Sequence, residues 1–151
     1  MAKRTLALTL SLTLALSAAA ALAAPLKGKT YKGSTPTSGV DHEHHKQKLV
    51  SHTISLKVSS NGKKVTVHMS FGHPLFYCGT QSEVHYQTTS PAKITSSGAF
   101  KATILERFTN SVGGAPITQI VSGHFNGKSV KGTIRTEAAE CSGSTSFSAH
   151  T

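Results

Sequence analysis

The residues best suited to chemistry in this sequence are three histidines in an acidic setting, Asp41-His42-Glu43-His44-His45. Imidazole is the commonest side-chain ligand of zinc and copper, so His42, His44 and His45 could chelate such an ion beside two carboxylates. The spacing differs from the His-Glu-x-x-His motif of zinc enzymes, because Lys46 stands four places after His42. A structured zinc site also needs ligands held near tetrahedral geometry, usually from more than one element. We therefore expect weak, opportunistic binding of Zn or Cu, with a dedicated metal site as the alternative.

A second kind of chemistry is open to the lysines. The chain carries a formal net charge of +10, which falls to +8 once Lys3 and Arg4 are removed with the leader described below. Lys63, Lys64 and Lys128 lie in or beside two Asn-Gly-Lys sequences. If both sequences are turns at the same end of the domain, that end would attract an anionic envelope polymer or an acidic protein. The alternative is dispersed charge that keeps the surface soluble.

The inventory for catalysis is short. Asp41 is the single aspartate, and the spacing of Glu83, Glu106, Glu137 and Glu140 predicts no shared pocket for a general acid and base. No nucleophile elbow, phosphate-binding glycine loop or dinucleotide fingerprint is present. The chain has no basic strand interleaved with aromatic residues of the kind that binds nucleic acid, so we expect no sequence-specific binding of nucleic acid. We expect a protein that is not an enzyme and that has no required cofactor.

Residues 1–23 are typical of a secretory signal peptide. Two basic residues precede an apolar stretch from Leu6 to Leu22, and Ala21-Leu22-Ala23 offers a small-residue cleavage site. The alternative, a transmembrane anchor, is disfavoured because Thr and Ser interrupt the stretch and its far end is rich in Ala. No later stretch is apolar enough to span a bilayer. We expect a secreted protein, extracellular or periplasmic, with no transmembrane anchor.

The two cysteines, Cys78 and Cys141, both follow the expected cleavage site. An oxidising compartment favours a disulfide between them, and two free thiols are the alternative. The bond would close a loop of about 63 residues and stabilise the fold by roughly 4 kcal/mol through loss of chain entropy in the unfolded state.

The clearest structural signal is a β-hairpin from Thr53 to Phe71. Apolar residues occupy alternate positions in both arms, namely Ile54, Leu56, Val58, Val65, Val67, Met69 and Phe71. Between the arms, Asn61-Gly62 predicts a type I′ turn, because both residue types tolerate positive φ. The same pattern returns around Asn126-Gly127-Lys128, with Val121, Gly123 and Phe125 before it and Val130, Gly132 and Ile134 after it.

The remaining pattern predicts one all-β domain over residues 51–151. Further strands are expected at residues 83–88, 94–96, 99–108 and 145–149, with no helical period. About eight short strands separated by turns favour an antiparallel β-sandwich or a small barrel with one disulfide. Residues 24–50 are expected to be a flexible segment with one weak edge strand at 30–32 and a His-rich loop at 39–48.

These motifs also carry a resemblance. The paired Asn-Gly-Lys hairpins, Cys78-Gly79 and the ending from Cys141 to Ala149 resemble a group of small exported bacterial proteins with an all-β domain. The likeness covers most of residues 53–151, and the His-rich stretch lies outside it. It implies the fold and export and assigns no activity. We therefore expect a secreted, non-enzymatic module that is envelope-associated or binds an anionic partner, with an exported metal-binding protein as the alternative.

Overall fold

The computed structural model describes residues 23–41, 43–49, 51–71, 84–87, 91–106, 117–137 and 142–151. Across this part of the chain the structure is all-β. The strands are β1 (Thr30–Ser34), β2 (Ser38–Asp41), β3 (Lys46–Lys48), β4 (Thr53–Val58), β5 (Lys64–Phe71), β6 (Val84–Gln87), β7 (Ala92–Lys93), β8 (Ala99–Glu106), β9 (Ile117–Asn126), β10 (Ser129–Glu137) and β11 (Gly143–His150).

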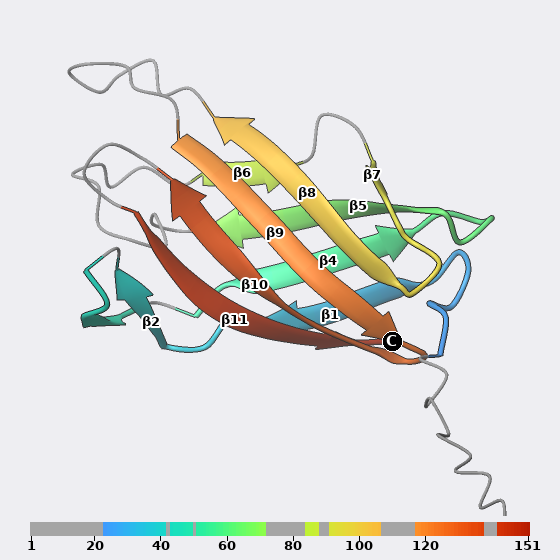
Figure 1. Cartoon of the computed structure of the whole chain (residues 1–151), viewed down its shortest axis with the longest axis horizontal. Helices are drawn as coiled ribbons and strands as arrows, with labels where there is room; N and C mark the ends of the chain where they lie inside the picture. Colours follow the sequence, from blue (N-terminus) through green and yellow to red (C-terminus); the bar gives the residue numbers. More distant parts are fainter. Residues whose placement is uncertain are drawn as a thin grey trace, which may run out of the picture.

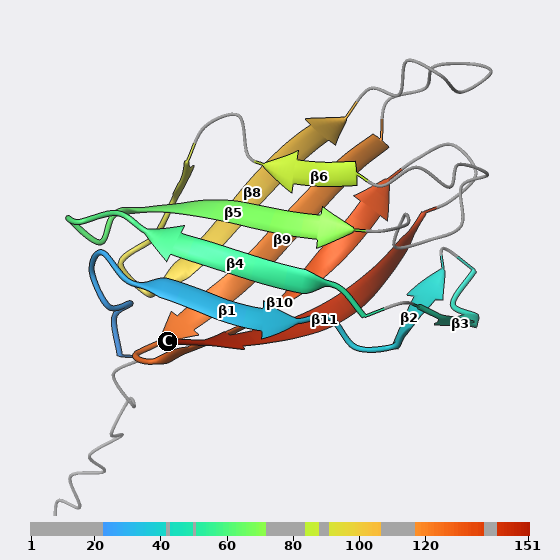
Figure 2. The ribbon, with the colours of Figure 1, turned by 180° about the vertical axis from the view of Figure 1, so that it is seen from behind.

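The strands form one antiparallel sheet in the order β6-β5-β4-β1-β11-β10-β9-β8. The sheet curls on itself, so that β8, β9 and β10 cross in front of β4 and β5 (Figure 1) and behind them in the reverse view (Figure 2). β7 pairs with β5, and Ile94 makes an isolated bridge to Phe100 of β8. This connection brings the last strand of the order back to β5 at one end. The predicted all-β antiparallel fold is confirmed, and its form is a nearly closed barrel.

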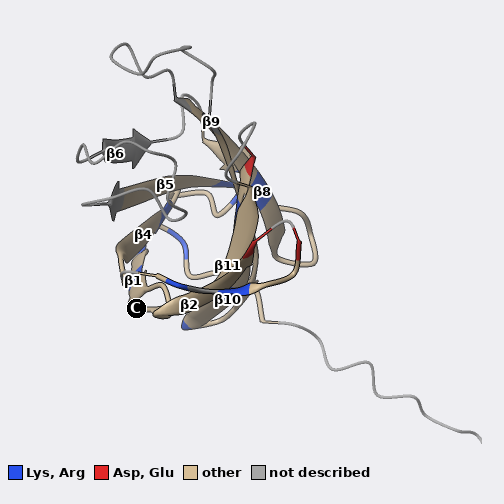
Figure 3. Cartoon of the chain, turned by 90° about the vertical axis from the view of Figure 1, so that its left-hand side faces the viewer, with Lys and Arg blue, Asp and Glu red and all other residues tan. Residues whose placement is uncertain are grey.

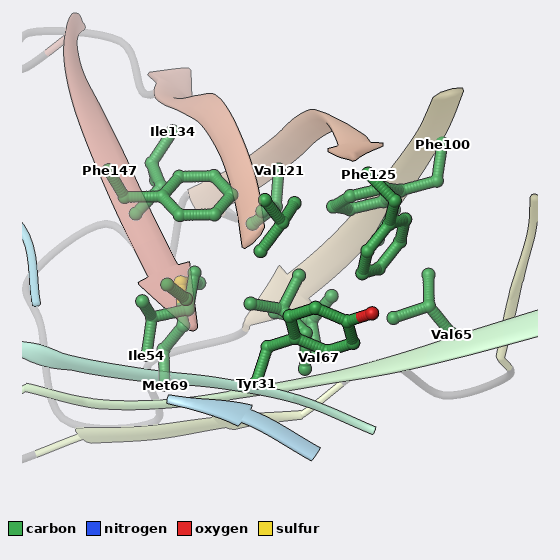
Figure 4. Packing of buried hydrophobic residues seen from close by; sticks show 14 of the residues in the cluster. Tyr31, Ile54, Val65, Val67, Met69, Phe100, Val121, Phe125, Ile134 and Phe147 are labelled. Carbon is green, nitrogen blue, oxygen red and sulfur yellow. The ribbon is translucent and has the colours of Figure 1, made fainter. Parts of the chain in front are cut away.

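The alternation of apolar residues decides which face of each strand is buried. Side chains from the two crossing layers point toward one another and fill the interior (Figure 4). The buried apolar residues are Tyr31, Leu49, Ile54, Leu56, Val58, Val65, Val67, Met69, Ile94, Phe100, Ala102, Ile104, Val121, Phe125, Val130, Ile134, Phe147 and Ala149. Among the described side chains, the inward apolar positions that the sequence predicts for β4, β5, β9 and β10 are thereby confirmed, and buried residues alternate with more exposed ones along β8 and β11 as well.

Two glycines make room for aromatic rings inside the barrel. A Cβ atom at Gly132 would lie 2.6 Å from Cε1 of Phe147 and 2.1 Å from the carbonyl oxygen of Ser122. A Cβ atom at Gly123 would lie 2.7 Å from Cε1 of Phe100. Large and small residues therefore alternate across neighbouring strands, which is how a small barrel fills its interior without voids.

The N-terminal part of the barrel corrects three predictions. β1 is not an edge strand, because it lies between β4 and β11 and fully buries Tyr31. The sheet thus begins at Thr30, ahead of the expected boundary at residue 51. Residues 39–48 are not simply a loop, since β2 and β3 pair there as a short hairpin. Local pattern indicated a strand at residues 30–32 but not its central place, because five residues with one large apolar side chain contain too few repeats to show that both edges are paired.

Both Asn-Gly-Lys sequences form turns, as predicted. The prediction of a type I′ turn at Asn61-Gly62 was wrong. Gly62 has a φ of 75°, whereas Asn61 is not among the non-glycine residues with positive φ. A type I′ turn belongs to a two-residue loop, and here Val58 pairs with Val65 across a longer one. Asn61 instead accepts a hydrogen bond from the N–H of Lys63 through Oδ1, at 3.0 Å. In the second turn, Gly127, with a φ of 57°, is one of two residues linking β9 to β10.

Several predictions fall outside the described residues. They concern Cys78 and Cys141, His42, and residues 1–22 of the expected signal peptide. The disulfide and the signal peptide therefore stay predictions. Within the described ranges, no helix is long and apolar enough to cross a membrane.

Replacing Gly132 with Ala tests the packing of the rings against the glycines. The added Cβ must displace both Phe147 and the backbone of β9, so we expect a loss of about 1–3 kcal/mol in the free energy of unfolding. Urea unfolding followed by circular dichroism measures it. Thr133→Ala, on the exposed face of the same strand, is the matched control and should change stability by less than about 0.5 kcal/mol. Equal stability of the two variants would contradict the packing argument.

Candidate functional site

The two Asn-Gly-Lys turns lie at the same end of the barrel (Figures 1 and 2). The segment that leads into β1 connects them. The Gly127 N–H donates to the Ala23 carbonyl oxygen at 3.0 Å, and the Gly28 N–H donates to the Ser59 carbonyl oxygen at 3.0 Å. We call this end, made of residues 23–30, 57–64, 93–98 and 126–129, the turn end. The condition that both turns project the same way is therefore met.

The hydroxyl of Tyr31 fixes this arrangement from inside the barrel. It donates to the carbonyl oxygen of Gly127 and accepts the N–H of Leu26 at 2.8 Å. The ring is fully buried and meets the ring of Phe125 edge-on, with the ring centroids 5.0 Å apart. One core side chain thus joins β1, the entry segment and the second turn, so the surface lysines nearby stand on a rigid base.

Lysines gather at the turn end. Those that the structure places there, all exposed, are Lys27, Lys29, Lys57, Lys63, Lys64, Lys93 and Lys128. Among the described residues, no side-chain carboxylate lies at this end. Sequence alone adds that residues 44–82 and 84–105 contain no Asp or Glu. The turn end is therefore a cationic surface, and its lysine ammonium groups repel one another in the absence of an anion.

The described acidic positions lie at the opposite end, which we call the far end. Asp41 ends β2, Glu106 ends β8 and Glu137 ends β10, with Glu43 in the turn after β2. Figure 3 views the barrel from this end and colours these positions red. Arg135 pairs with Glu137 there, with 3.2 Å between Nε and Oε1. The two signs of charge are thus segregated along the barrel, although the far end also holds basic residues.

Each predicted lysine of the anionic-partner site has a clear place. Lys63 and Lys64 close the first turn and Lys128 lies in the second, and all three are exposed at the turn end. Sequence reasoning did not single out Lys57 or Lys93 as site residues. No local pattern could have found Lys93, because its place depends on the pairing of β7 with β5 across a long segment of chain.

The His-rich turn between β2 and β3 is organised by Asp41. Its Oδ1 accepts the N–H of Glu43 at 3.0 Å and that of His45 at 2.8 Å, and His44 has a φ of 65°. Nδ1 of His45 lies 3.4 Å from Oε2 of Glu43 and 3.7 Å from Oδ2 of Asp41. Within the described part of the chain no three metal-ligating side chains form a site for an ion, and His42 lies outside it. The structure brings His44 and His45 into one turn without building a closed site.

The interior toward the far end also contains buried polar side chains, which sequence reasoning did not identify. Gln119 and Thr136 are buried and hydrogen-bonded to each other, with 2.8 Å between Oε1 and Oγ1. Thr145 donates from Oγ1 to the carbonyl oxygen of Ser38 at 3.0 Å. Strand alternation was the available signal, because Gln119 stands two places before the inward Val121. These hydrogen bonds satisfy the groups inside the barrel, so we assign them a structural role.

Tyr31→Phe removes the hydroxyl while keeping the ring. The Leu26 N–H and the Gly127 carbonyl oxygen would each lose a partner in a partly buried place, so we expect unfolding to become easier by about 1–3 kcal/mol. Thermal unfolding checks the loss. Amide hydrogen exchange should quicken at Gly127 and Gly28 and stay unchanged at Gly143 at the far end. An unchanged exchange rate at Gly127 would show that the hydroxyl does not hold the turn.

Comparisons with known proteins do not assign the chain to a family. No protein-family model matches the chain, and no curated protein matches it.

Proposed function

We propose that this protein is an exported, non-enzymatic β-barrel module that binds an anionic polymer through its turn end. The observation that carries the proposal is the segregation of charge: exposed lysines collect around two turns with no described side-chain carboxylate among them. Export rests on the signal-peptide pattern of residues 1–23. A partner in the cell envelope would meet such a surface directly after secretion.

Electrostatics favour a polymer over a single small anion. An exposed ammonium gains little from one partner, because water and salt screen the pair. Several lysines that contact one chain act together, since each contact releases counterions from the polymer and the gains add. The backbone that carries the lysines of the turn end is hydrogen-bonded, so little backbone conformational entropy is lost when the polymer binds.

The proposal of a binding module rather than an enzyme is supported by how the described carboxylates are used. Asp41 caps backbone N–H groups in its own turn, and Glu137 pairs with Arg135 on the surface. Both uses are local and structural. In the described strand ladders, Glu137 stands opposite Thr118 and Asp41 stands opposite Gly143.

Retention of the protein on an anionic resin tests the role of the turn end. The double variant Lys63→Gln, Lys128→Gln should elute from immobilised polyphosphate at a lower salt concentration than the wild type. Lys46→Gln, Lys48→Gln is the matched control, because it removes the same charge from exposed positions on β3 at the far end. We expect the control to elute close to the wild type. An equal shift for both variants would mean that net charge alone, and not the turn end, governs binding.

Metal binding by the His-rich turn is the second candidate, favoured by the approach of His45 to the carboxylates of Asp41 and Glu43. Calorimetric titration of zinc and copper into the oxidised protein tests it, beside a variant with His42, His44 and His45 changed to Ala. A metal-binding function requires binding at a fixed ratio that the variant loses. Because His45 and Glu43 are largely exposed, we expect weak heats that differ little between the two proteins. Tight stoichiometric binding would make the metal function the better account.

A further inference from the structure

Two lysines at the turn end face each other directly across a strand pair. In the ladder between β5 and β7, Lys64 and Lys93 are register partners, followed by Val65 and Ala92. Directly opposed residues of an antiparallel pair have Cβ atoms about 4.5–5.5 Å apart. Both lysines are exposed, so both ammonium groups stand on the outer surface. Like charges in this relation repel and destabilise the pairing.

A third lysine extends the pair onto the next strand. Lys57 of β4 is the register partner of Thr66, which stands two places after Lys64 on β5. Lys57 and Lys64 are therefore diagonal neighbours on one face of the sheet, about 7–8 Å apart. We call Lys57, Lys64 and Lys93 the lysine cluster. It runs across three neighbouring strands in the order β4-β5-β7.

The pairing of Lys64 with Lys93 is unlike that of other lysines in the described ladders. Elsewhere the cross-strand partners are mostly hydroxyl side chains: Lys101 faces Ser122, and Lys131 faces Ser148 on one side. The repulsion within the cluster has no described carboxylate nearby to offset it, and Ile94, next to Lys93, is held by an N–H donated to the carbonyl oxygen of Lys63 at 2.8 Å. The strands thus hold the Cβ atoms of these lysines close together, and an anion between their ammonium groups would relieve the repulsion.

We propose that the lysine cluster is the docking point for phosphate groups of a linear polymer that lies across β4, β5 and β7. This deepens the function proposed above and rests on it. Lysine ammonium groups bind phosphate as compact point charges. Neighbouring strand positions about 5 and 8 Å apart allow three such groups to reach one polymer with closely spaced charges. The neighbouring outward residues on β4 and β5 are Ser55, Thr66 and His68, with no Phe, Tyr or Trp. The cluster therefore selects a polymer by the density of its negative charge, and β4 and β5 offer no aromatic side chain on which a sugar or a base could stack.

Binding to sodium polyphosphate as a function of salt tests the cluster. The double variant Lys64→Gln, Lys93→Gln should weaken binding and reduce the slope of log K against log salt by about 1.5, since each lost phosphate contact removes roughly 0.7–0.9. The control is Lys101→Gln, Lys131→Gln, which removes the same charge from exposed positions on β8 and β10. We expect its slope to stay within about 0.5 of the wild type.

Two further ligands identify what the cluster recognises. Inorganic phosphate at the same phosphate concentration should bind far more weakly than polyphosphate, because it cannot contact several lysines at once. Hyaluronan, which carries one carboxylate per disaccharide, should also bind more weakly than polyphosphate at equal charge. Equal affinity for polyphosphate and hyaluronan would contradict the claim that the cluster selects a polymer by the spacing of its charges.

The failure of this inference can be told from the failure of the proposed function. If the wild type does not bind polyphosphate or hyaluronan, the proposed function is wrong and the cluster falls with it. If the wild type binds and both double variants lose the same slope, the cluster is not the docking point while polymer binding stands. An independent readout is thermal unfolding without polymer: Lys93→Gln should raise the melting temperature at low salt, and added salt should cancel the rise. No rise would show that the opposed lysines do not repel one another.

Discussion

The hydroxyl of Tyr31 is the interaction on which the arrangement of this barrel's functional end depends. It lies in the core, yet it bonds to the second turn and to the entry segment, which is in turn bonded to the first turn. Two turns that are far apart in the sequence are thereby held at one end. Because these hydrogen bonds are partly buried, they compete less with water than surface contacts do.

The two ends of the barrel differ in the polarity of some buried side chains, and they differ in surface charge as well. Near the turn end the interior is filled by apolar side chains such as Val58, Val65 and Phe125, whereas Gln119 and Thr136 are buried toward the far end. Outside, lysines dominate at the turn end and the described carboxylates lie at the far end (Figure 3). The packed apolar core near the turn end thus supports the backbone that carries the closely spaced lysines.

The sequence predicted the parts of the structure that local periodicity determines. Alternation alone was enough for β4, β10 and β11, because each strand places a full run of apolar or small residues on one face. It could not predict that β1 is central, since its two neighbouring strands, β4 and β11, come from distant parts of the chain. Nor could it predict Lys93 as a site residue, because cross-strand register between distant segments leaves no local signal. The turn at Asn61 differed because loop length, and not residue type alone, selects the turn.

The central claim is that the turn end is the anion-binding surface of this protein. Backbone amide chemical shifts, recorded while sodium polyphosphate is added to isotope-labelled protein, test it most directly. The account predicts shifts confined to residues 27–30, 57–64, 93–98 and 126–129, with the largest changes at Lys64 and Lys93. Shifts spread evenly over the surface, or concentrated around Asp41 and Glu137 at the far end, would contradict it.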